Sequence, residues 1–102
     1  MPVVFIWPPQ FAYEQYEELV RRLRPGSKVL ASPSDWPVEG LLVHVAGEGP
    51  NGFRVVDVWE SDVALRRFGD ILRPILRELG VEGEPEIYQT HTFVSAQRWS
   101  LE

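Results

Sequence analysis

The segment from Gly40 to Ser61, GLLVHVAGEGPNGFRVVDVWES, limits most strongly what this chain can fold into. Apolar and polar residues alternate on both sides of the stretch Gly49-Pro50-Asn51-Gly52, whose composition is typical of a tight turn between two strands. We therefore predict an antiparallel β-hairpin in which Glu48 lies opposite Phe53.

This register places His44 directly opposite Asp57. It also gives two further pairs, Leu42 with Trp59 and Ala46 with Val55. Directly opposed side chains in an antiparallel pair lie about 4.5–5.5 Å apart at Cβ, close enough for a carboxylate to orient an imidazole. A slip of one residue would put His44 and Asp57 on opposite faces of the sheet. The hairpin therefore predicts a His–Asp pair at one point of a sheet.

The composition is that of an ordinary globular protein, with 44% hydrophobic and 25% charged residues in a chain of 102. We expect one domain over residues 1–100 and do not interpret 101–102, which could be a tail left by an expression vector. The net charge of −5 argues against a nucleic-acid partner, because phosphate binding needs a positive field. The arginines are interleaved with acidic residues on expected helices, which predicts a solvated surface for them.

The chain has no cysteine, which excludes a disulfide framework, thiolate zinc sites and a cysteine nucleophile. The apolar run Pro2–Trp7 is too short to span a membrane and lacks the flanks of a signal peptide. We therefore expect a cytoplasmic protein without a membrane partner.

Two helices and two further strands complete the expected order strand, helix, strand, strand, helix, strand. The expected strands outside the hairpin cover residues 2–7 and 84–94, and the expected helices cover 11–23 and 62–79. Ser61 is the expected N-cap of the second helix, and Gly80 is its expected C-terminal stop. Pro74 should kink or split the second helix, because proline removes one backbone hydrogen bond. The irregular stretch 24–39 contains an expected short strand at Lys28–Ala31 and Trp36, which is either a pocket lid or a plug of the core.

This order is that of the α+β ferredoxin-like fold (βαββαβ), with both helices on one face of a four-stranded antiparallel sheet. Its first strand lies between the third and the fourth. Both faces of the hairpin nevertheless carry apolar residues, for example Val43 and Val45 on one face and Ala46 on the other. An apolar second face predicts a partner surface, and a symmetric homodimer that pairs sheet to sheet would cover it.

In strand order and in three motifs the chain resembles the dimeric α/β-barrel superfamily, and within it the antibiotic biosynthesis monooxygenase-like group. The motifs are G-L-x-x-H at Gly40–His44, G-F-R-V-V-D-V-W-E-S at Gly52–Ser61, and S-D-V-A-L-R-R-F at Ser61–Phe68. The resemblance covers nearly the whole chain except residues 24–39. It implies the fold more specifically than the activity, because the superfamily includes cofactor-independent oxygenases, cyclases, lactone isomerases and haem-degrading enzymes.

Haem degradation does not fit this sequence. Haem-degrading relatives use a histidine on the second helix and an asparagine on the first strand. The expected second helix here has no histidine, and Pro2–Trp7 has no asparagine.

His44 and Asp57 are the first candidates for chemistry. Asp57 would orient the His44 ring as a general base, or the two would form a structural hydrogen bond near the core. His91, on the expected last strand, is a further catalytic candidate because it could face the same cavity; the alternative for His91 is a histidine on the surface or at the rim. Two histidines and one carboxylate also resemble a 2-His-1-carboxylate iron site, but the spacing does not enforce ligand distances, so we expect no metal and no cofactor.

Aromatic residues near the expected strand ends and helix faces would suit a flat apolar ligand, although each also fits a plain core position. The candidates for substrate binding are Trp7, Tyr16, Trp36, Trp59, Phe68, Tyr88 and Phe93. Tyr16 and Tyr88 could also donate to an enolate or phenolate oxygen. The sequence thus predicts a small cofactor-independent enzyme acting on an aromatic or enolisable molecule, of monooxygenase, cyclase or isomerase type. The alternatives are a non-catalytic dimeric ligand-binding protein and a metal-dependent enzyme.

Overall fold

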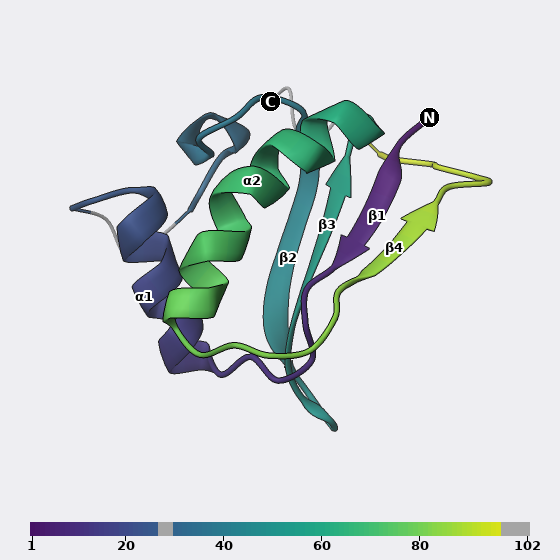
Figure 1. The fold of residues 1–102 in the computed structure, drawn as a ribbon. Helices are drawn as coiled ribbons and strands as arrows, with labels where there is room; N and C mark the ends of the chain where they lie inside the picture. The colour runs from purple at the N-terminus through teal and green to yellow at the C-terminus, as the bar shows by residue number, and fades with distance from the viewer. Residues whose placement is uncertain (27–29, 97–102) are drawn as a thin grey trace.

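The computed structural model describes residues 1–26 and 30–96. The elements follow in the order β1 (Val3–Ile6), α1 (Tyr13–Leu23), the short 3-10 helix η1 (Pro33–Asp35), β2 (Leu41–Gly49), β3 (Gly52–Trp59), α2 (Asp62–Glu78) and β4 (Glu86–Gln89), as Figure 1 shows. Half of the expected strand at Lys28–Ala31, residues 28 and 29, lies outside the described residues, and the other half, Leu30 and Ala31, is not in a strand.

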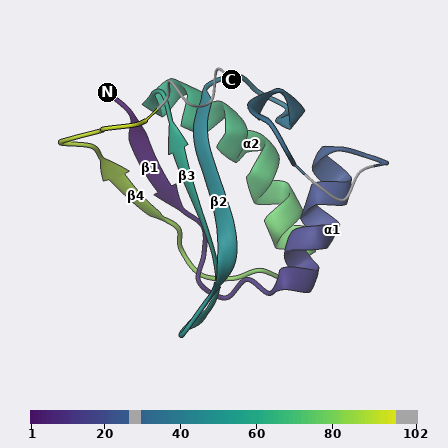
Figure 2. The same cartoon turned by 180° about the vertical axis from the view of Figure 1, so that it is seen from behind.

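The four strands form one antiparallel sheet in the order β2-β3-β1-β4, so β1 lies between β3 and β4 as predicted. Both helices lie against one face, and the view from behind shows the sheet in front of them (Figure 2). This α+β arrangement is compatible with the ferredoxin-like fold.

The hairpin register is confirmed at the point that matters for the site, because His44 is paired with Asp57. The predicted pair of Leu42 with Trp59 is wrong, since Leu41 takes that position and the register shifts between Leu41 and Val43. A bulge adds one residue to one strand and leaves it unpaired, so the alternation is shifted only beyond the bulge. His44 lies on the turn side of it and keeps the predicted face.

Local side-chain chemistry sets the two ends of α2. The Ser61 hydroxyl accepts the Ala64 N–H at 3.1 Å and caps the first turn. At the other end Gly80 has φ +74°, and the Val81 N–H returns to the Leu76 carbonyl at 2.9 Å, which is a Schellman motif. Of the two outcomes predicted at Pro74, a kink or a split, the split does not occur, because one helix runs from Asp62 to Glu78. A proline removes a single hydrogen bond, and buried leucines on both sides hold this helix against the sheet.

The last strand is much shorter than predicted. It covers only Glu86–Gln89 instead of 84–94, and its last pair is Gln89 with Val3. Because β4 pairs only with β1, the ladder ends where β1 begins. His91 and Phe93 therefore lie in the segment that follows the sheet.

The two faces of the sheet differ in what covers them. The face under the helices carries the aromatic core, in which Trp7, Trp59 and Phe68 are fully buried. The other face has a cluster of half-buried or exposed aliphatic residues, which we call the open face: Val4, Ile6, Val43, Val45, Val56 and Val58. Val45 is 57% exposed. In the described part of the chain, no helix is long and apolar enough to cross a membrane.

Candidate functional site

The site is built around Asp57, a carboxylate with no exposed surface in the middle of β3. Three N–H donors converge on it. Oδ2 accepts the indole N–H groups of Trp7 at 2.9 Å and Trp59 at 3.3 Å, and Oδ1 lies 2.6 Å from Nδ1 of His44. A buried carboxylate needs such donors, because an unpaired one would carry a large desolvation cost. Asp57 is therefore fixed in position from three sides.

His44 continues the chain of hydrogen bonds. Its Nε2 lies 2.7 Å from the hydroxyl of Tyr16, which comes from α1. The Asp57 carboxylate has no proton to donate, so Nδ1 of a neutral His44 ring carries the hydrogen and Nε2 accepts the Tyr16 O–H. We call this arrangement of Tyr16, His44 and Asp57 the relay.

The His44 ring is enclosed by aromatic rings. Trp36 meets it edge-on with centroids 4.7 Å apart, and the Tyr16 ring lies nearly parallel to it at 5.9 Å. Trp36 follows η1 and is itself buried, so it both covers His44 and joins the core. The Trp36 indole N–H is buried without a hydrogen-bond partner among the described residues.

One side of His44 reaches an open hollow of about 630 Å³. The hollow lies between β2, the residues around η1 and the chain at Ser95–Ala96, and Trp36 also lines it. The His44 side chain is only 9% exposed, and Asp57 does not line the hollow. His44 is thus the residue of the relay that lines a space of ligand size.

Burial and the neighbouring charge act on Tyr16. Burial first, and then the negative charge of Asp57, raise the pKa of Tyr16 to about 12. Tyr16 therefore remains a protonated donor at neutral pH, and it can pass a proton on only while it accepts another.

The structure brings together some of the aromatic residues that the sequence singled out. Trp7 and Trp59 donate to Asp57, while Phe68 packs on Trp59 with centroids 4.9 Å apart and is plain core. Tyr88 pairs with Val4 and so lies on the open face, away from the relay. Its hydroxyl donates to the Glu86 carboxylate, and that bond raises the pKa of Tyr88.

The remaining candidates also lie outside the relay. His91 is exposed beyond β4, where its Nδ1 lies 3.0 Å from Thr92 Oγ1, so the expected shared cavity with His44 is wrong. Phe93 is half-buried in the same segment. Across residues 1–26 and 30–96, no three His, Cys, Asp or Glu side chains gather as a metal site would need.

Sequence reasoning missed two features. The bond from Tyr16 to His44 joins residues far apart in the sequence, and only the apolar stripe of α1 hinted that Tyr16 faces the sheet. A second hollow beside α2 is lined by Arg66, Arg73 and Arg77, which were expected to be solvated surface. Their spacing of seven and four residues was the available signal, since it puts all three on one side of a helix.

Comparisons with known proteins identify no relative: no model of a protein family matches the chain, and no curated protein matches it in sequence.

Proposed function

We propose that this protein is a small cofactor-independent acid–base enzyme, in which His44 removes a proton from an aromatic or enolisable molecule. The observation that supports this proposal is the unbroken relay from Asp57 through His44 to Tyr16 at the edge of a hollow. An imidazole oriented by a fixed carboxylate is the usual form of a general base that works near neutral pH.

The proton would move from a carbon or oxygen of the ligand to Nε2 of His44. In the free protein the Tyr16 hydroxyl occupies that lone pair, so a ligand must displace it. The displaced hydroxyl, kept protonated by its raised pKa of about 12, would donate to the enolate or phenolate oxygen that forms. The Trp36 N–H, which has no partner among the described residues, would be a second donor beside the hollow. Oxygenation, cyclisation and isomerisation all begin with this proton transfer.

The test is hydrogen–deuterium exchange of acidic C–H groups in D2O, followed by proton NMR over a panel of aryl ketones, β-diketones and phenols. We expect the protein to catalyse exchange of at least one compound and His44→Ala to lose that exchange. His91→Ala is the matched control, because it removes the histidine that lies outside the relay. Tyr16→Phe frees Nε2 but removes the proposed donor to the enolate oxygen, so exchange should be slower than in wild type and still depend on His44. Equal exchange by wild type and His44→Ala would refute the proposal.

The second candidate is a non-catalytic ligand-binding protein. It is favoured by the complete satisfaction of His44, whose two ring nitrogens both have partners and whose side chain is 9% exposed. Under this alternative a compound of the panel binds, wild type catalyses no exchange, and His44→Ala only weakens binding.

We further propose that the chain belongs to the dimeric α/β-barrel superfamily, in its antibiotic biosynthesis monooxygenase-like group, and forms a homodimer through the open face. Support comes from the order β2-β3-β1-β4 and from the aliphatic side chains that the helices leave uncovered. Sedimentation velocity tests the dimer. Val45→Glu places a charge on the open face and should give monomers, whereas Val63→Glu, at an equally exposed valine of α2, should not. The expected cytoplasmic location stays a prediction.

A further inference from the structure

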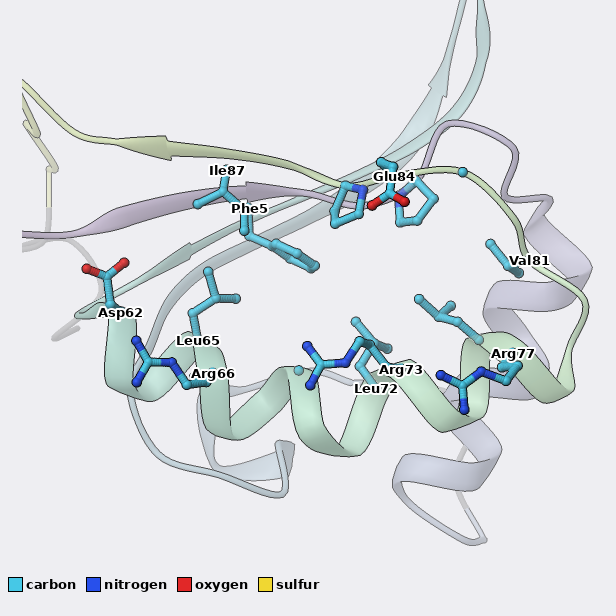
Figure 3. Close-up of a pocket in the computed structure, with 15 residues that line it drawn as sticks. Phe5, Asp62, Leu65, Arg66, Leu72, Arg73, Arg77, Val81, Glu84 and Ile87 are labelled. Carbon is cyan, nitrogen blue, oxygen red and sulfur yellow. The ribbon is translucent and has the colours of Figure 1, made fainter.

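A second hollow lies between α2 and the chain that leads into β4, as Figure 3 shows. It has a volume of about 630 Å³ and shares no lining residue with the hollow beside His44. Pockets of about 300–1,000 Å³ are typical of small-molecule sites. We call this hollow the α2 groove.

The floor of the α2 groove is apolar. It is formed by Phe5, Leu65, Leu72, Leu76, Val81 and Ile87. Ile87 pairs with Phe5 and so lies on the helix-covered face, yet it remains 54% exposed because the groove separates it from α2. An apolar ligand body would remove this surface from water.

The rim of the groove along α2 is cationic. Arg66, Arg73 and Arg77 are spaced along this side of the helix beside the apolar floor (Figure 3). Two acids also line the groove. Asp62, at the first turn of α2, accepts a hydrogen bond from the Gln89 side chain, and Glu84 lies on the opposite rim. Three arginines along one groove stand out in a chain whose net charge is −5. Such a row attracts an anionic group.

The central arginine is free to exchange its partner. Arg73 forms an ion pair with Asp70 at 2.8 Å, but both side chains are about two-thirds exposed, and pairs of that kind are weak. Gly69 also lines the groove, and a Cβ added there would lie 3.3 Å from Nη1 of Arg73. Glycine weakens a helix interior relative to alanine, and here it leaves space beneath the Arg73 side chain.

We propose that the α2 groove binds an anionic amphiphile, with an acyl or aromatic body on the floor and a carboxylate or phosphate at Arg73 and its arginine neighbours. This site is separate from the relay and does not depend on the proposed function. Carboxylate and phosphate both carry negative charge and present two oxygens that a planar guanidinium group can contact at once.

The test uses decanoate, decyl phosphate and neutral 1-decanol below their micelle-forming concentrations, with binding followed by titration calorimetry and amide chemical shifts. We expect both anions to bind more tightly than decanol and to shift amides of α2. The tighter anion identifies the preferred head group. Anions that bind no better than decanol, or that shift only residues around His44, would overturn the proposal.

Variants locate the charge. Arg73→Gln should weaken decanoate roughly five- to tenfold, the effect of one partly exposed charge-assisted contact. Arg67→Gln is the matched control, because Arg67 follows Arg66 on α2 but does not line the groove. Gly69→Ala should weaken decanoate while it raises the melting temperature, an opposite pair of effects that a damaged fold cannot produce. Equal affinities of Arg73→Gln and Arg67→Gln would overturn the proposed site.

Discussion

Replacing Asp57 with asparagine should invert the relay. In wild type the carboxylate accepts from Trp7, Trp59 and His44. An asparagine at this position keeps one oxygen, which we expect to face the two indole N–H groups, and so its NH2 faces Nδ1 of His44. Nδ1 must then accept, and the ring proton moves to Nε2.

The magnitude follows from the three bonds. Hydrogen bonds to a charged group contribute about 1.5–3 kcal/mol and neutral ones about 0.5–1.5 kcal/mol, so each indole bond weakens by about 1 kcal/mol. The His44 bond is reversed, and without the carboxylate charge it weakens by a similar amount. Asp57→Asn should therefore lower the free energy of unfolding by about 3 kcal/mol. Asp57→Ala leaves all three donors buried without an acceptor, and breaking a buried pair in this way costs about 3–5 kcal/mol.

Two assays check this prediction. Urea unfolding followed by tryptophan fluorescence gives the stability, because Trp7 and Trp59 both donate to Asp57. Long-range nitrogen–proton NMR of the imidazole gives the tautomer, with the proton on Nδ1 in wild type and on Nε2 in the variant. A proton that stays on Nδ1 in Asp57→Asn, or a stability equal to that of wild type, would refute the hydrogen-bond assignment.

Three further predictions concern pH and backbone geometry. Ultraviolet titration should show that Tyr16 ionises near its raised pKa of about 12. Because the folded state favours the neutral phenol, its contribution to the free energy of unfolding is complete below the unfolded pKa near 10 and is lost as the pH rises to 12. Tyr16→Phe should remove this pH-dependent loss of stability. The pKa of Asp35 is lowered first by the Ala31 N–H and then by the Ser32 N–H and the Arg24 charge. Asp35→Asn should therefore destabilise the protein at pH 7, and the difference in stability should disappear as the pH falls through that lowered pKa. Urea unfolding at several pH values measures this difference. Gly40→Ala should destabilise by roughly 2–4 kcal/mol in the same assay, because Gly40 has φ +110° and an added Cβ would lie 2.5 Å from the Ala64 side chain; an unchanged midpoint would contradict this geometry.

The sequence was most informative where local rules act alone. The glycine-flanked turn determined the hairpin register, and this was sufficient to bring His44 and Asp57 together. The Ser61 cap and the Gly80 stop were equally local. The bulge at Leu41–Val43 and the early end of β4 were not predictable in this way, because both depend on which strand lies alongside.

The parts of the site that the sequence missed depend on tertiary packing. Tyr16 fits an ordinary core position of an amphipathic helix, and only the docking of α1 brings its hydroxyl to His44. In the sequence, the arginines of the α2 groove have the pattern of a solvated helix surface. Only the fold shows that the helix and the chain leading into β4 enclose a groove beside them. His91 was expected on the last strand because the alternating pattern continues in the sequence beyond Gln89. The strand ends earlier, because Gln89 is the last residue of β4 that pairs with β1.

Asp57 itself favours a function over a purely structural role. Replacing a buried polar network with apolar side chains of similar volume is often neutral or stabilising, so packing alone does not require a carboxylate in an aromatic core. Trp7 and Trp59 each direct their single donor toward it, and its remaining oxygen orients the His44 ring, the member of the relay that lines the hollow. A network that only filled space would have no reason to include an imidazole beside a ligand-sized opening. We therefore propose that the relay acts on a ligand and does not only stabilise the fold.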